Sequence, residues 1–472
     1  GRPDPRGGPG LRHGRHGVVT PPTGFGPRPS RRAVLAAGVG GIAGALAGCS
    51  GPRAEVGRDA GSTTDAITGF PRRPDAVGVP HLRPDGNRVV DGRGDLPAAA
   101  PVDVIPAGIG TPMWVVGVPG ERGSRWVVVD RTGRAAGVRV VGGATAPEPV
   151  RPERLPAGQP PVVGVVDGRL RLWGPPPDAA RHAVPTVLPG GGSAYVDSAG
   201  RLAVRTTGGR TERLAVAALS DARVLRHGEG RVALLTGPTD RYEHGVLGDA
   251  IEAERVTTAS VGGGAAVVDR TVSVPSPAVI EGQAPIWADL TDSGRPDLIV
   301  TASDRAEGAR ILAYVDGTDT VRRGPPIGGG NRWRHQLAVA PFAPDGVPEL
   351  AVVRTPHIGG RVEFYRATAT GLAIVATLDG YATHVIGSRV LDGGLAADAD
   401  ADGRIELLVP NQARTQLVGV RRTARGATEA WRVPVGGTVA SNLAAVGTDR
   451  GGVDVAVGRT DGTVRIWPAR TG

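Results

Sequence analysis

The stretch that most constrains this chain is residues 398–406, in which aspartates occupy three alternate positions and a glutamate follows Gly403. An apolar run, Leu407–Val409, comes directly afterwards and has the composition of a buried strand. Calcium takes about six to eight oxygen ligands, and a glycine lets the binding loop turn sharply around the ion. The spacing therefore predicts a Ca²⁺ loop next to a strand. The expected ligands are the carboxylates of Asp398, Asp400, Asp402 and Glu406 and the carbonyl of Arg404.

An acidic turn followed by an apolar run recurs three more times in the second half of the chain. The four copies end at Asp297, Glu349, Glu406 and Asp454, which are 52, 57 and 48 residues apart. Another alternating apolar run begins 10 to 14 residues beyond each of these acids. A repeat of about fifty residues that contains several short strands is typical of a β-propeller blade.

These copies resemble the FG-GAP/VCBS repeats, the calcium-loop propeller blades that also occur in integrin heads. The resemblance covers residues 280–470 and implies a propeller whose blades carry Ca²⁺ loops. Only residues 398–406 keep the full ligand set of the family. Asp289 and Asp297, in the first copy, are expected to form a weaker second site.

The composition also favours an all-β fold. The chain has 75 glycines and 42 prolines without a collagen period, which indicates many turns between short strands. No long amphipathic helix is evident. Strand signals begin at about residue 105, and dividing residues 105–472 by the repeat length predicts a propeller of seven blades, with eight shorter blades as the alternative.

The net charge of +9 does not indicate a nucleic-acid-binding protein. All 55 basic residues are arginines, and residues 1–48 hold seven of them with one aspartate. The rest of the chain therefore carries a net charge of only +3 and has no basic stripe or RNA-binding motif. We expect no nucleic-acid partner.

The N-terminal region has the features of an export signal. Arg31 and Arg32 precede a short apolar stretch that ends in Leu-Ala-Gly-Cys at Cys49. These features resemble the twin-arginine motif, with general export as the alternative, and the lipobox of bacterial lipoproteins, which implies that Cys49 receives a diacylglycerol. We expect residues 1–48 to be the signal segment, residues 49–104 a flexible tether and residues 105–472 the propeller. The expected location is the cell envelope, with Cys49 anchoring the chain to a membrane.

Four polar clusters that contain histidine recur along the second half of the chain, so their side chains can converge in a folded propeller. Histidine and carboxylate side chains together can ligate a metal or move protons. They can equally satisfy backbone groups where loops turn into blades. The candidate ligand-binding residues are Tyr242, His244, Asp249, Trp333, His335, His357, Arg361 and His384.

The sequence favours a non-catalytic, calcium-binding recognition or scaffold module. No nucleophile elbow, phosphate loop or zinc-protease motif is present. We expect a monomer that binds an extracytoplasmic protein or glycan through its loops, because a propeller is a scaffold whose ligand is set by its loops. The alternative is a propeller enzyme that acts on carbohydrate or another small envelope molecule through the histidine-bearing loops. A quinone-dependent dehydrogenase is disfavoured, because repeated tryptophan-docking motifs are missing.

Overall fold

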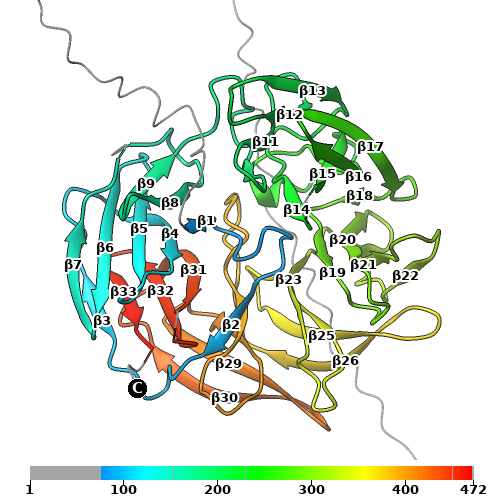
Figure 1. Ribbon diagram of the computed structural model, residues 1–472. Helices are drawn as coiled ribbons and strands as arrows, with labels where there is room; N and C mark the ends of the chain where they lie inside the picture. Colours follow the sequence, from blue (N-terminus) through cyan, green and yellow to red (C-terminus); the bar gives the residue numbers. More distant parts are fainter. Residues whose placement is uncertain (1–75, 152–153, 229, 449, 470–472) are drawn as a thin grey trace, which may run out of the picture. The chain divides into compact units, whose positions relative to one another are not determined.

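A computed structural model describes residues 76–472 except 152–153, 229, 449 and 470–472. These residues form 33 strands and one 3₁₀ turn, η1 (Gly245–Leu247), and no α-helix occurs among them (Figure 1). The prediction of an all-β fold is confirmed. The predicted signal segment and Cys49 lie outside the described residues.

Most strands belong to short antiparallel sheets built from consecutive segments of the chain. Three of the four-stranded sheets consist only of strands that pair with the next one in sequence. The first comprises β4 (Pro112–Val118), β5 (Arg125–Asp130), β6 (Ala135–Val141) and β7 (Ala144–Glu148). The second comprises β10 (Thr186–Val187), β11 (Ser193–Val196), β12 (Arg201–Arg205) and β13 (Thr211–Ala215). The third comprises β23 (Arg334–Ala340), β24 (Glu349–Arg354), β25 (Arg361–Ala367) and β26 (Leu372–Asp379).

A nine-stranded sheet contains two further runs of four strands, which the short strand β18 (Val279–Ile280) joins. The first run is β14 (Leu225–His227), β15 (Arg231–Thr239), β16 (Glu252–Gly262) and β17 (Ala265–Ser273). The second run is β19 (Ile286–Ala288), β20 (Asp297–Asp304), β21 (Gly308–Tyr314) and β22 (Val321–Arg323).

The three remaining sheets each include one strand from the N-terminal part of the described chain. The first unites β1 (Ala76–Gly78) with β8 (Val162–Val166) and β9 (Arg169–Trp173). The second unites β2 (Val89–Arg93) with β27 (Leu395–Asp398), β28 (Glu406–Pro410), β29 (Gln416–Thr423) and β30 (Gly426–Pro434). The third unites β3 (Val102–Val104) with β31 (Val439–Gly447), β32 (Val453–Arg459) and β33 (Val464–Trp467).

Successive antiparallel sheets of about four strands are the blades of a β-propeller. The fold predicted from the repeats is therefore confirmed at the level of architecture. The number of blades stays a prediction: the described residues form seven sheets, and counting the two runs of the nine-stranded sheet separately gives eight units.

Alternate residues of a single strand pack against two different neighbouring sheets. In β5, Val127 and Val129 join an apolar cluster with β8 and β9, whereas Trp126 and Val128 join another with β32 and β33. Side chains of a strand alternate between its two faces, so a strand that lies between two sheets is apolar at every position. This explains why the run Trp126–Val129 is continuously hydrophobic.

The predicted flexible tether over residues 49–104 is wrong from Ala76 onward. Strand β1 pairs antiparallel with β8, β2 pairs parallel with β27, and β3 pairs antiparallel with β33. The propeller thus begins at least 29 residues before the predicted boundary at 105. These pairings were not evident because each joins segments far apart in sequence.

The segment Pro84–Leu96 connects several sheets through backbone hydrogen bonds. The carbonyls of Pro84 and Asp85 accept from Arg226 in β14 (2.8 Å) and Trp287 in β19 (3.0 Å). Next along the segment, the side-chain amide of Asn87 donates to the carbonyl of Val339 in β23 and accepts from the backbone amide of Val339, each at 2.8 Å.

Two further contacts continue the same path. The carbonyl of Arg88 accepts from Ala396 in β27 (2.8 Å), and the amide of Arg93 donates to Gly451 (2.7 Å) between β31 and β32. The segment Pro84–Leu96 is therefore hydrogen-bonded to five successive groups of strands, which begin with β14, β19, β23, β27 and β31.

Candidate functional site

The predicted calcium loop lies between β27 and β28. Asp398 is the last residue of β27, and Glu406 is the first of β28. One carboxylate oxygen each from Asp398, Asp400 and Glu406 lie within 4.8 Å of one another, the only such group of three metal-ligating side chains among the described residues. Gly403 has a φ of 85°, a left-handed conformation that side chains disfavour and that the turn requires.

A guanidinium group contacts three of the four carboxylates of this loop. Arg421, in β29, donates to Asp400 (2.6 Å) and Glu406 (2.6 and 2.9 Å), and its Nη1 lies 2.9 Å from Asp402. Burial raises the pKa of Glu406 to about 7 in spite of these hydrogen bonds. Arg421 therefore already supplies positive charge where the sequence predicts a divalent cation.

Asp398 is the carboxylate that Arg421 does not reach. Its residue is 5% exposed, and its Oδ1 has no hydrogen-bond partner among the described residues. Its Oδ2 accepts from the amide of Gly403 at 3.1 Å. Burial, followed by repulsion from Asp402 and Asp400, raises the pKa of Asp398. A buried carboxylate oxygen without a donor is costly, and the nearest cation among the ion pairs of Asp398 is Arg93, whose Nε lies 3.6 Å from Oδ2.

The preceding copy of the repeat uses arginine in the same way. Arg366 lies across the β24–β25 pair from Glu349, as Arg421 lies across the β28–β29 pair from Glu406. It donates to Glu349 (2.9 and 3.1 Å) and to both carboxylate oxygens of Asp345 (3.1 Å each). Arg422 gives Glu349 a second cationic partner at 2.8 Å.

The first and last copies use backbone amides instead. Asp297 accepts from the amides of Leu290 and Thr291 at 3.0 and 2.9 Å, and Asp289 accepts from the amides of Ser293 and Gly294 at 2.9 and 2.7 Å. In the last copy, Asp454 accepts from the amide of Ala469 at 2.6 Å. The weaker calcium site expected at Asp289 and Asp297 stays a prediction.

The structure brings together four of the candidate ligand-binding residues in one aromatic group. This histidine cluster consists of Trp333, His335, His357 and His384. The rings of Trp333 and His335 stack with centroids 5.0 Å apart, and His384 meets Trp333 edge-on at 5.0 Å. The ring of His357 lies 5.9 Å from that of His384. The segments before β23, after β24 and after β26 therefore converge, and all three flank strands of one sheet.

Burial keeps His335 and His384 in the neutral state, and hydrogen bonds orient their rings. His335 donates from Nε2 to the Leu391 carbonyl (3.0 Å) and accepts at Nδ1 from the Thr383 hydroxyl (2.9 Å). His384 donates from Nε2 to the carbonyl of Ser388 (2.8 Å). Burial lowers the pKa of His384 to about 4 and that of His335 well below its usual range. These two rings therefore carry no charge at neutral pH.

The other candidates lie at various distances from this group. Tyr242 is buried, and its ring lies 5.8 Å from that of His244, which pairs with the buried Glu281 (2.5 Å). Asp249 forms an ion pair with Arg389 at 2.5 Å. Arg361 does not join the cluster, because it pairs with Asp379 across β25 and β26 (2.5 Å).

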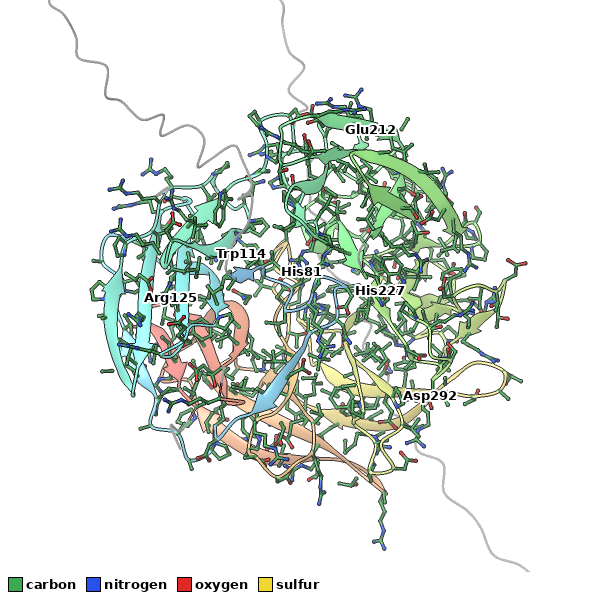
Figure 2. All side chains as sticks on the ribbon, in the orientation of Figure 1. His81, Trp114, Arg125, Glu212, His227 and Asp292 are labelled. Atoms are coloured by element: carbon green, nitrogen blue, oxygen red, sulfur yellow. The ribbon has the colours of Figure 1, made fainter. Side chains whose placement is uncertain are left out.

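Sequence reasoning missed a buried group of charged residues. Asp392 is 1% exposed and accepts from Nε of Arg88 (2.8 Å) and Nη1 of Arg223 (2.9 Å). His81, labelled in Figure 2, is buried nearby, and burial followed by the charge of Arg223 lowers its pKa to about 3. The only sequence signal for this centre is an aspartate that follows the apolar pair Val390 and Leu391.

No family model matches the chain, and no curated protein matches it. Among solved structures, BamB from Moraxella catarrhalis is 14% identical, with a TM-score of 0.36, over 81% of this chain and 99% of BamB. A chain of a mitotic checkpoint complex is 13% identical, with a TM-score of 0.35, over 90% of this chain and 97% of its own length. A protein from Thermus thermophilus described as an oxidoreductase (glucose dehydrogenase) is 15% identical, with a TM-score of 0.33, over 61% and 98%. Likenesses this distant assign no function.

The described residues include no helix that is both long and apolar enough to cross a membrane.

Proposed function

We propose that this chain is a recognition or scaffold propeller that binds a protein partner through the loops of the histidine cluster. The observation that carries the proposal is a set of outward-facing aliphatic side chains beside the buried rings. Ile358, Val385 and Ile386 are 67%, 47% and 59% exposed. We call these three residues the aliphatic patch. They follow His357 and His384, whose ring contact holds the two loops side by side. Exposed aliphatic residues that gather on rigid loops mark interaction sites.

Two residues of the histidine cluster, Trp333 and His335, have contacts that favour a structural role over catalysis. Both ring nitrogens of His335 are engaged, and Trp333 is buried against Val246, Leu247 and Leu391. A general base needs a free nitrogen within reach of a substrate. Trp333 and His335 therefore support the loops that present the aliphatic patch, whereas Nδ1 of His357 and of His384 has no hydrogen-bond partner among the described residues.

Photo-crosslinking tests this proposal. A photoreactive residue at Ile386 should yield a discrete crosslinked protein in the native cell. The same residue at Val267 in β17, which is 64% exposed, is the matched control and should yield none. No crosslink at Ile386, or identical products at both positions, would contradict the proposal. Turnover of an envelope substrate by the purified chain would favour the enzyme alternative.

We further propose that the loop at residues 398–406 binds one Ca²⁺. The unpartnered Oδ1 of buried Asp398 supports this, and the carboxylates of Asp400, Asp402 and Glu406 would supply further oxygens. The ion would compete with Arg421 for those carboxylates. At a free concentration about a hundred times Kd, binding would add about 2.7 kcal/mol to the free energy of unfolding. Millimolar Ca²⁺ should therefore raise the melting temperature of the wild type over that in EDTA, and Asp400→Ala should lose most of this shift.

Export and lipidation at Cys49 complete the proposed role. The sequence Leu-Ala-Gly-Cys supports it, and two acyl chains would make a stable anchor where one would not. The propeller would then present its loops from a membrane surface in the cell envelope.

A further inference from the structure

A cavity of about 410 Å³ opens next to the aliphatic patch. Val385 and Ile386 line it, and Met113 of β4 and Val390 add further apolar surface. The remaining walls come from loops of several sheets, so the cavity lies where separate parts of the propeller meet. Its size is in the range of sites that enclose a few side chains or a small molecule.

The charged side chains of this cavity all have one sign. Arg131, Arg389 and Arg414 line it together with His182, and no aspartate or glutamate does among the described residues. The charge of Arg389 is already neutralised, because it lies 2.5 Å from Asp249 and 3.5 Å from Asp221. The guanidinium groups of Arg131 and Arg414 form no ion pair with any described residue.

Two unpaired arginines beside an apolar wall define the chemistry of the ligand. Guanidinium groups bind carboxylates in bidentate geometry, and they gain most where the surroundings exclude water. An aliphatic group on the same ligand would bury Val385 and Ile386, which are otherwise exposed to water. A ligand with only a carboxylate would leave Val385 and Ile386 exposed to water. A ligand with only an aliphatic group would leave the two arginines without a counter-charge.

We propose that this cavity binds a peptide segment of the partner protein in which an acidic residue lies beside an aliphatic one. The inference rests on the proposed recognition function and names the chemistry that the partner presents. The complementarity of charge favours an acidic segment over a neutral or basic one. The aliphatic patch, which continues into the cavity, favours a peptide over a free inorganic anion.

An array of blocked hexapeptides tests the proposal directly. Every position is glutamate, glutamine, leucine or glycine, and the probe is the purified full-length chain. Bound peptides should contain glutamate next to leucine, and replacing that glutamate by glutamine should weaken binding at least tenfold. The double variant Arg131→Gln, Arg414→Gln should lose the same peptides. Arg425→Gln, which changes an exposed arginine in the turn after β29, is the matched control and should keep them.

Three results would overturn the assignment: no bound peptide, equal binding of glutamine and glutamate peptides, or unchanged binding by the double variant. Melting of each variant separates loss of binding from loss of folding. If the array fails while crosslinking at Ile386 still captures a partner, only the cavity's role is wrong. If both fail, the proposed recognition function is wrong as well.

Discussion

Asp392→Asn tests how far the buried charged centre stabilises the propeller. Asp392 accepts hydrogen bonds from two arginines that are themselves buried, Arg88 (side chain 8% exposed) and Arg223 (4%). Asparagine keeps the shape of the side chain but leaves both guanidinium groups without a counter-charge. Removing one partner from a buried ion pair costs about 3–5 kcal/mol. We therefore expect the free energy of unfolding to fall by about that amount.

The pKa of Asp392 gives a second route to the magnitude. Although burial opposes the charged form, Arg223 and Arg88 lower the pKa to about 2 from the usual 3.8. Each pKa unit corresponds to about 1.4 kcal/mol, so the folded state stabilises the carboxylate by roughly 2–3 kcal/mol relative to its protonated form. A lowered pKa means that this stabilisation is complete above about pH 5 and is lost progressively as the pH falls towards 2.

Urea-induced unfolding of both proteins at about pH 7, 5.5 and 2.5 provides the assay. The difference between wild type and Asp392→Asn should be constant at the two higher values and should shrink at pH 2.5. Asp319→Asn, in an exposed turn, is the control and should change stability by less than about 0.5 kcal/mol. A difference at pH 7 within that range, or one that does not depend on pH, would refute the reasoning.

Three further predictions concern the loop at residues 398–406, the lipid anchor and strand β33. Arg421→Gln should tighten Ca²⁺ binding about tenfold or more in calorimetry, because hydrogen bonds between charged groups contribute about 1.5–3 kcal/mol; weaker binding would mean that Arg421 supports the ion rather than competes with it. Cys49→Ala should leave unprocessed chain that fails to enter the detergent phase; normal partitioning would exclude the lipid anchor. Deleting residues 463–467 removes β33 from between β3 and β32, and should abolish the cooperative melting transition seen by circular dichroism. A melting temperature within a few degrees of wild type would show that the pairing of β33 with β3 and β32 is dispensable.

Local patterns in the sequence predicted the strands and turns well. The strand after Glu406 was predictable because a short apolar run that follows an acidic turn depends on neighbouring residues alone. The position of the loop at residues 398–406 between two strands also followed from its spacing. The histidine loops converged because His335, His357 and His384 lie on or beside strands of the same sheet, β23 to β26.

Contacts between distant segments could not be predicted in this way. Strand β2 pairs in parallel with β27 although about 300 residues separate them, and Asn87 binds β23 through a side chain that has no periodic signal. Arg421 is 15 residues from Glu406 and reaches it only because β28 and β29 pair in a specific register. Asp392 and Arg88 lie 304 residues apart. Each of these contacts depends on how distant segments pair in the folded protein rather than on local sequence.

The native mass of the membrane-extracted protein tests the recognition proposal most directly. The full-length chain, extracted from its own membrane in mild detergent, should migrate as a complex larger than one chain. The double variant Val385→Ser, Ile386→Ser should migrate as a single folded chain, whereas Val267→Ser should keep the complex. A wild type that migrates as a single chain, or a complex that survives the double substitution unchanged, would contradict the proposal.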